Sequence, residues 1–155
     1  MQPQLDGFDY VLERQLKPEA RKDVIKFLAE LGVKPTSMID ISDGLASEIH
    51  HICKHSNVGC SVYEEKIPID PMTYKVVREF DLDPTVCAVS GGEDYELLFT
   101  ISQGDFDKIK GNPHWTVIGH MTDASQGINL ITSGGSVTPL KAQGWDSFGD
   151  NKDEN

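Results

Sequence analysis

Two short runs of this chain place carboxylates where an apolar segment meets a turn. In the first, MIDISDGL at residues 38–45, an apolar strand delivers Asp40 and Asp43 to a turn that opens a helix. In the second, SGGEDYELLF at residues 90–99, two glycines and the carboxylates that begin with Glu93 precede an apolar strand. Glycines let a backbone approach a ligand closely, and carboxylate oxygens suit Mg²⁺. Because bare carboxylates would repel a phosphate, a phosphate ligand would need a divalent metal between the two, and the pattern indicates magnesium.

Each run also has a purely structural interpretation. Asp43 or Ser42 can cap the helix that follows, and a Gly-Gly-acid sequence before a strand can be an ordinary bulge or tight turn. The residues alone leave both interpretations open. His51 and His55 are one helical turn apart but lack the acid of a zincin motif, and the adjacent His50 points to another face. We interpret all three as surface or core histidines.

Helices and strands alternate along the chain, and they must hold these runs in place. Helical spacing of apolar residues predicts a helix over 18–31 that Gly32 ends, and another from residue 45 that Asn57 and Gly59 end. The other predicted elements are strands at 37–41, 60–63, 95–101, 116–121 and 128–132, helices at 71–80 and 106–110, and a hairpin turn at 134–136. This order favours a layered α+β or α/β domain over a bundle or a sandwich.

Composition bounds the class of protein. The 155 residues are one domain's worth of chain, and the net charge of −11 argues against a nucleic-acid partner, whose phosphates attract clustered Lys and Arg. No apolar stretch reaches transmembrane length and no signal-peptide pattern opens the chain, so we expect no membrane partner and a cytoplasmic location. Cys53, Cys60 and Cys87 are odd in number and lack the paired spacing of a zinc site, which predicts buried, reduced thiols.

Taken together, the two acidic runs resemble those of the thiamine-monophosphate kinase family. The closing GWDSF at residues 144–148 is similar to that family's C-terminal signature, and the resemblance covers essentially the whole chain but only the second half of such a kinase. It implies the fold of the C-terminal domain of aminoimidazole ribonucleotide synthetase, an α+β fold in which a mixed β-sheet is layered with α-helices. It also implies that residues 1–17 connect to an N-terminal nucleotide-binding domain absent from this chain and that 18–148 form the C-terminal domain. The acidic composition at the C-terminal end predicts that 149–155 are a disordered acidic tail.

The resemblance assigns the first run to metal and nucleotide. Asp40 and Asp43 match aspartates associated with Mg²⁺, and Ser42 matches a residue beside ATP. These roles suit the chemistry, because Mg²⁺ keeps several waters and bridges a few carboxylates to substrate phosphates. Ser42 could offer its hydroxyl or its backbone N–H to a phosphate oxygen near the helix start, where the helix dipole also favours an anion.

The resemblance assigns the second run and the C-terminal end to the substrate. Glu93 matches a residue that contacts thiamine monophosphate, whose cationic thiazolium and aminopyrimidine suit a carboxylate. Phe148, and with it Trp145, matches the aromatic end of the family, where a ring could stack on the substrate's heterocycle. Either ring could equally pack onto the core of the domain.

The activity implied by the resemblance is that of an ATP-dependent phosphotransferase. In the family's reaction the γ-phosphoryl group of ATP passes to thiamine monophosphate and gives thiamine diphosphate, a step of thiamine biosynthesis. The family also implies a homodimer in the full-length protein, and a chain without the nucleotide-binding half is expected to be inactive alone. Two alternatives are a related ATP- and Mg²⁺-dependent synthetase of the same superfamily and a non-catalytic ligand-binding domain of that fold.

Overall fold

A computed structural model describes residues 22–69, 71–79 and 96–142 of the chain. Four α-helices lie within those residues: α2 (Lys22–Glu30), α3 (Leu45–Ser56), α4 (Pro71–Glu79) and α6 (Phe106–Ile109). The strands are β1 (Ser37–Asp40), β2 (Val58–Tyr63), β3 (Leu97–Thr100), β4 (Gly119–Asp123), β5 (Ile128–Ile131) and β6 (Val137–Pro139). None of the helices in this part of the chain is both long and apolar enough to cross a membrane.

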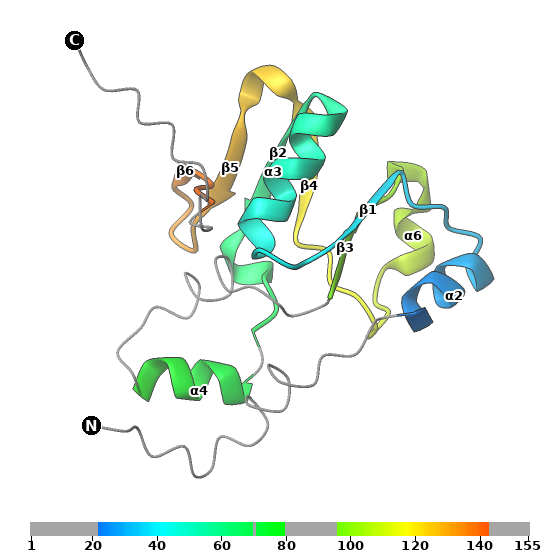
Figure 1. The fold of residues 1–155 in the computed structure, drawn as a ribbon, viewed down its shortest axis with the longest axis horizontal. Coiled ribbons are helices and arrows are strands. Elements are labelled where there is room, and N and C mark those ends of the chain that lie inside the picture. The colour runs from blue at the N-terminus through cyan, green and yellow to red at the C-terminus, as the bar shows by residue number, and fades with distance from the viewer. Residues whose placement is uncertain (1–21, 70, 80–95, 143–155) are drawn as a thin grey trace.

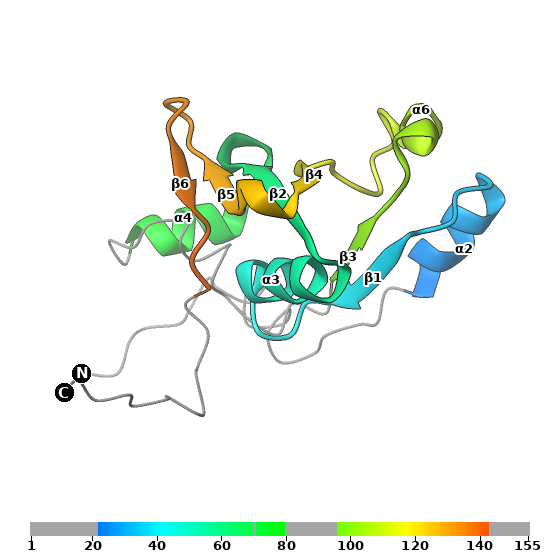
Figure 2. The same ribbon diagram turned by 90° about the horizontal axis from the view of Figure 1, so that it is seen from above.

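The described strands form two sheets. β1 and β3 pair antiparallel, with Ser37 opposite Thr100 and Asp40 opposite Leu97. The other sheet has the order β4-β2-β5-β6, in which β2 pairs antiparallel with β4 and parallel with β5. Figures 1 and 2 show the four-stranded sheet toward one end of the molecule and α2 and α6 at the other, with β1 and β3 between them. Helices and a mixed sheet in this arrangement confirm the expected α+β fold.

Helix α3 packs between β1 and the four-stranded sheet, and its apolar face forms the larger core (Figure 1). Apolar residues recur along it at helical spacing, which is why one side of the helix is buried. The helix ends at Asn57, whose left-handed backbone (φ 52°) lets its N–H bond back to the carbonyls of the last turn. The buried members of this core are Leu45, Ala46, Ile49, Cys53, Cys60, Val62, Ile67 and Leu140.

Helices α2 and α6 cover the opposite face of the two-stranded sheet. Successive side chains of a strand point to opposite faces, so Leu97 and Phe99 pack against this smaller core while Leu98 packs against the larger one. Phe99 also meets the Trp115 ring edge-on, with 6.4 Å between ring centroids. The buried members of the smaller core are Val24, Leu28, Val33 and Ile109. The β1–β3 pair is therefore held between the two cores, which fixes its position in the fold.

Most of the predicted elements are confirmed, and two differ in detail. The strand predicted at 116–121 is observed as β4 at Gly119–Asp123, because the pairing with β2 begins only where Gly119 lies opposite Val62. The turn at 134–136 is confirmed as a hairpin, and β6, the strand that follows it and pairs with β5, was not predicted. β6 is short and exposed, so its three residues have no alternating apolar pattern by which to recognise it.

Candidate functional site

The turn between β1 and α3 presents the first acidic run to solvent. Asp40 is the last residue of β1, and it is exposed. Beyond it, the Ile41 N–H donates to the carbonyl of Glu96, the residue before β3, at 2.8 Å, so the contact between the two chain segments continues one residue past the strands. Ser42 and Asp43 are also exposed, and only Gly44 separates them from the start of α3 at Leu45. The strand and the helix thus place Asp40 and Asp43 on the two sides of the same tight turn.

Helix α3 does not use Asp43 or Ser42 as its cap. Its N-cap residue is Gly44, and no side chain bonds to the free N–H groups as a cap. Gly44 has φ 103° and ψ 151°, a conformation that residues with a Cβ rarely adopt. The glycine therefore makes the sharp bend from turn to helix, and the capping interpretation of Ser42 and Asp43 does not apply in this structure.

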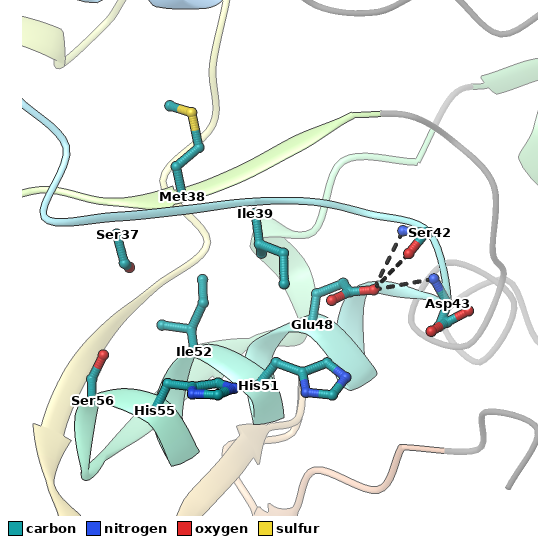
Figure 3. Close-up of a pocket in the computed structure, with 10 residues that line it drawn as sticks. All are labelled: Ser37, Met38, Ile39, Ser42, Asp43, Glu48, His51, Ile52, His55 and Ser56. Carbon is teal, nitrogen blue, oxygen red and sulfur yellow. Dashed lines mark hydrogen bonds between the residues drawn. The ribbon is translucent and has the colours of Figure 1, made fainter.

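A buried carboxylate, Glu48, organises the turn from inside. It lies one turn into α3 and is only 2% exposed. Its Oε1 accepts from the Ser42 N–H at 3.4 Å, the Ser42 hydroxyl at 3.2 Å and the Asp43 N–H at 3.2 Å. Both Ser42 donors that we expected to face a phosphate are thus directed at Glu48 (Figure 3).

Sequence reasoning assigned no role to Glu48, although a signal was present. Glu48 follows Leu45 by three residues and precedes Ile52 by four, which places it on the stripe that helical periodicity assigns to the core. A carboxylate is seldom buried unless it is hydrogen-bonded or paired. A charged residue on the apolar stripe next to an acidic turn was therefore the feature that could have identified it.

An open pocket of about 440 Å³ runs from this turn along the space between β1 and α3. Figure 3 shows Ile39 and Ile52 facing each other across it, while Met38 points away on the other side of β1. His51 and His55 line its rim from α3, and both are exposed. Of the two positions that the sequence left open, surface or core, the structure shows these histidines at the surface, and they give the pocket a polar edge over an apolar floor.

His50 lies on a different side of α3 and has a separate partner. Its Nε2 lies 2.6 Å from the Leu140 carbonyl oxygen. Because a carbonyl only accepts, Nε2 must carry the proton and donate it. His50 therefore connects α3 to the end of the β5–β6 hairpin, at the point where the chain continues toward residues 143–155.

Three of the six predicted site residues lie outside the described residues: Glu93, Trp145 and Phe148. Asp94, whose role the sequence left open, lies there too. The described strand that follows the second acidic run, β3, begins beside Asp40, since Leu97 pairs with Asp40. The fold therefore brings the strand ends that adjoin the two runs together, although the runs are about fifty residues apart in the sequence.

The donor set of the turn fits a hydrated divalent cation. Asp40 and Asp43 offer exposed carboxylate oxygens, and neither forms an ion pair within the residues that the structure describes. Among those same residues, no group of three or more His, Cys, Asp or Glu side chains is close enough to enclose a metal. The two exposed carboxylates by themselves suit Mg²⁺, which binds through one or two carboxylates and completes its shell with water and substrate phosphates.

One known protein family matches most of this chain. The family described as AIR synthase related protein, C-terminal domain, matches residues 4–130. This chain belongs to that family. Membership in the AIR synthase related family confirms the resemblance on which the expected fold depended.

Curated relatives of this AIR synthase related domain are thiamine-monophosphate kinases. The kinase of Escherichia coli O157:H7 is 38% identical over 146 residues, which cover 90% of this chain and 43% of the relative. The kinase of Aquifex aeolicus is 31% identical over 140 residues, covering 89% and 41%. The chain thus spans less than half the length of the curated relatives it matches.

Solved structures of thiamine-monophosphate kinases also resemble this chain. The structure of thiamine monophosphate kinase from Aquifex aeolicus matches 84% of this chain and 41% of that one, with 28% identity and a TM-score of 0.66. A structure described as AaThiL complexed with AMPPCP and TMP matches 95% of this chain and 44% of that one, with 27% identity and a TM-score of 0.74. The hydrogenase maturation protein HypE of E. coli shares the fold at 16% identity and a TM-score of 0.61.

Proposed function

We propose that this chain forms the C-terminal half of a thiamine-monophosphate kinase. The reaction would transfer the γ-phosphoryl group of ATP to thiamine monophosphate, giving thiamine diphosphate and ADP. The observation that carries the proposal is the similarity over 90% of the chain to thiamine-monophosphate kinases. The similarity to a solved structure that holds AMPPCP and TMP supports the same pair of substrates.

In this proposal Asp40 and Asp43 hold Mg²⁺. When bound, the ion would reduce the repulsion between two anionic substrates and orient their phosphates. The exposed position of both carboxylates at the β1–α3 turn supports this role, because they can bind a hydrated ion from the solvent side. Further ligands would come from substrate phosphates or from parts of the protein outside the described residues.

Ser42 remains our candidate for a contact with ATP, and the structure refines what that contact requires. Its N–H and hydroxyl both donate to Glu48, so neither is available to a phosphate oxygen unless those bonds are exchanged. Glu93, Trp145 and Phe148 remain proposed contacts to thiamine monophosphate on the basis of the family resemblance. A carboxylate would face the cationic thiazolium, and an aromatic ring would stack on a heterocycle.

The proposed transfer needs no general base from the protein. A phosphate oxygen of thiamine monophosphate, already ionised, forms the new bond to the γ-phosphorus of ATP. The bond from that phosphorus to the oxygen bridging the β- and γ-phosphates breaks, and the electron pair leaves with ADP. Positioning and charge neutralisation then supply most of the catalysis, and the residues of the turn contribute to both.

The proposal extends to the assembly. A domain with nucleotide-binding residues would precede this one, residues 1–17 would connect the two and 18–148 would form the C-terminal domain, and the working enzyme would be a homodimer. Its location would be the cytoplasm, a proposal consistent with the buried, free thiols of Cys53 and Cys60. This chain alone would then form no thiamine diphosphate.

The test is turnover of thiamine monophosphate with Mg-ATP by the complete protein that contains this chain, alone and with Asp43→Asn. We expect selective formation of thiamine diphosphate and a loss on the order of 100-fold in Asp43→Asn, with a higher Mg²⁺ requirement. A matched control is Asp107→Asn, because Asp107 is an exposed aspartate on α6 whose only described ion pair is a 3.7 Å contact to Lys110. Unchanged turnover and Mg²⁺ dependence in Asp43→Asn would contradict the metal assignment.

Alternative substrates separate the proposal from its rivals. Turnover of an aminoimidazole-pathway or selenide substrate, with none of thiamine monophosphate, would assign the protein to a related synthetase. A folded protein that binds no ATP would be a ligand-binding domain. Either result would overturn the kinase proposal.

A further inference from the structure

We infer that Glu48 is a positioning residue that holds the β1–α3 turn in the geometry its aspartates need to bind a metal. The inference rests on the proposed function for its purpose, but the contact itself is a feature of this chain. Among the residues that the structure describes, Glu48 is the charged residue whose side chain is buried. The side-chain hydrogen bonds described for it all come from Ser42 and Asp43 of the turn.

The energetics favour a specific role for this carboxylate. Burying an ionised carboxyl group is costly unless several donors satisfy it. Glu48 receives three donors on one oxygen, and two of them are backbone N–H groups that every substitution in the turn except proline would keep. Its place in the first turn of α3 adds the favourable field of the helix N-terminus. The turn therefore supplies the partners that allow Glu48 to be buried.

The contact acts on the backbone from which Asp43 projects. Bonds from the N–H groups of Ser42 and Asp43 to one atom fix the orientation of two successive peptide groups. Figure 3 shows the Glu48 side chain reaching from α3 to the inside of the turn, while the Asp43 carboxylate points outward. Glu48 itself is too buried to bind a hydrated ion, so it would act through the turn.

Glu64 provides a matched control elsewhere in the fold. Its Oε2 accepts from the Ser133 N–H at 2.7 Å and the Ser133 hydroxyl at 3.1 Å, the same donor types that reach Glu48 from Ser42. This contact joins the end of β2 to the β5–β6 hairpin, away from the acidic turn. Removing it should disturb a loop of similar kind without affecting metal binding.

The experiment has two readouts. Amide hydrogen exchange of the 155-residue chain would be compared for wild type, Glu48→Ala, Glu48→Gln and Glu64→Ala, and Mn²⁺ binding, as a probe for Mg²⁺, would be titrated in the complete enzyme. In Glu48→Ala the Ser42 and Asp43 amides should exchange about tenfold faster, and Mn²⁺ affinity should fall by about tenfold or more. Glu48→Gln, which keeps an accepting oxygen of the same reach, should restore part of both.

Glu64→Ala should accelerate the Ser133 amide and leave both readouts at the turn unchanged. The inference is overturned if Glu48→Ala keeps wild-type exchange at Ser42 and Asp43, or if their exchange rises while Mn²⁺ affinity stays the same. If Glu48→Ala does not fold, the intermediate values expected for Glu48→Gln decide the question by the same criteria. Failure of the wild type to bind Mn²⁺ would overturn both the metal assignment of the proposed function and the positioning role of Glu48. Unchanged Mn²⁺ affinity in Glu48→Ala would overturn only the positioning role.

Discussion

Replacing His50 with alanine tests whether α3 also anchors the segment that leads to the proposed substrate residues. The His50 Nε2 donates to the Leu140 carbonyl at 2.6 Å, and Leu140 is only 4% exposed. Loss of the donor would leave a largely buried carbonyl without this partner, at a cost of roughly 1–3 kcal/mol. With a urea m-value of about 2 kcal/mol per molar, a cost of ~2 kcal/mol lowers the unfolding midpoint by about 1 M.

Urea unfolding of the chain, followed by circular dichroism, would measure this shift. His55→Ala is the control, because His55 is an exposed histidine on the same helix, and its midpoint should stay close to that of the wild type. His50→Gln should recover part of the loss, since the amide retains an N–H donor. A midpoint for His50→Ala within about 0.3 M of the wild type would refute the assigned energy.

The same variant has a functional consequence under the proposed function. Leu140 immediately precedes the stretch of chain that ends in Trp145 and Phe148, which we propose contact thiamine monophosphate. Loosening the origin of that stretch should raise the KM for thiamine monophosphate more than the KM for ATP. Equal changes in both constants would show that His50 supports the fold without a separate effect on substrate binding.

Two further predictions concern the backbone of the turn and a buried thiol. Gly44→Ala should lower the free energy of unfolding by about 1–3 kcal/mol and reduce turnover of the complete enzyme, because a backbone φ of 103° is strained for alanine. The control is Gly111→Ala, at φ 76° and with open space around it, which should lower the urea midpoint but leave turnover unchanged. Burial raises the pKa of the Cys60 thiol to about 12 from its ordinary 9.0, so the folded chain holds this proton more tightly than the unfolded chain. The contribution of this thiol to folding stability is therefore fully present below about pH 9 and is lost as the pH rises to about 12. Over that interval the urea midpoint of the wild type should fall more steeply with pH than the urea midpoint of Cys60→Ala. Parallel pH profiles for the two proteins would contradict this explanation.

The outcome for the cysteines shows how far composition can reach. An odd number of thiols without paired spacing predicted buried, reduced cysteines, and Cys53 and Cys60 are buried and free, while Cys87 lies outside the described residues. The prediction succeeded because it needed only the absence of a pattern and the tendency of thiols to be buried. It did not indicate that Cys53 of α3 and Cys60 of β2 share one core.

The sequence by itself determined the local elements and the order of the acidic runs. Apolar spacing, Gly32 after α2 and Asn57 after α3 act within a few residues, so their effects can be read along the chain. The tertiary structure decided which polar groups meet. The pairing of Asp40 with Leu97 and the bond from His50 to Leu140 join residues 57 and 90 positions apart, and nothing in local spacing encodes such contacts. Helical spacing already marks Glu48 as a residue of the core-facing stripe, but whether its carboxylate meets the turn depends on how α3 packs against β1, which the sequence does not show.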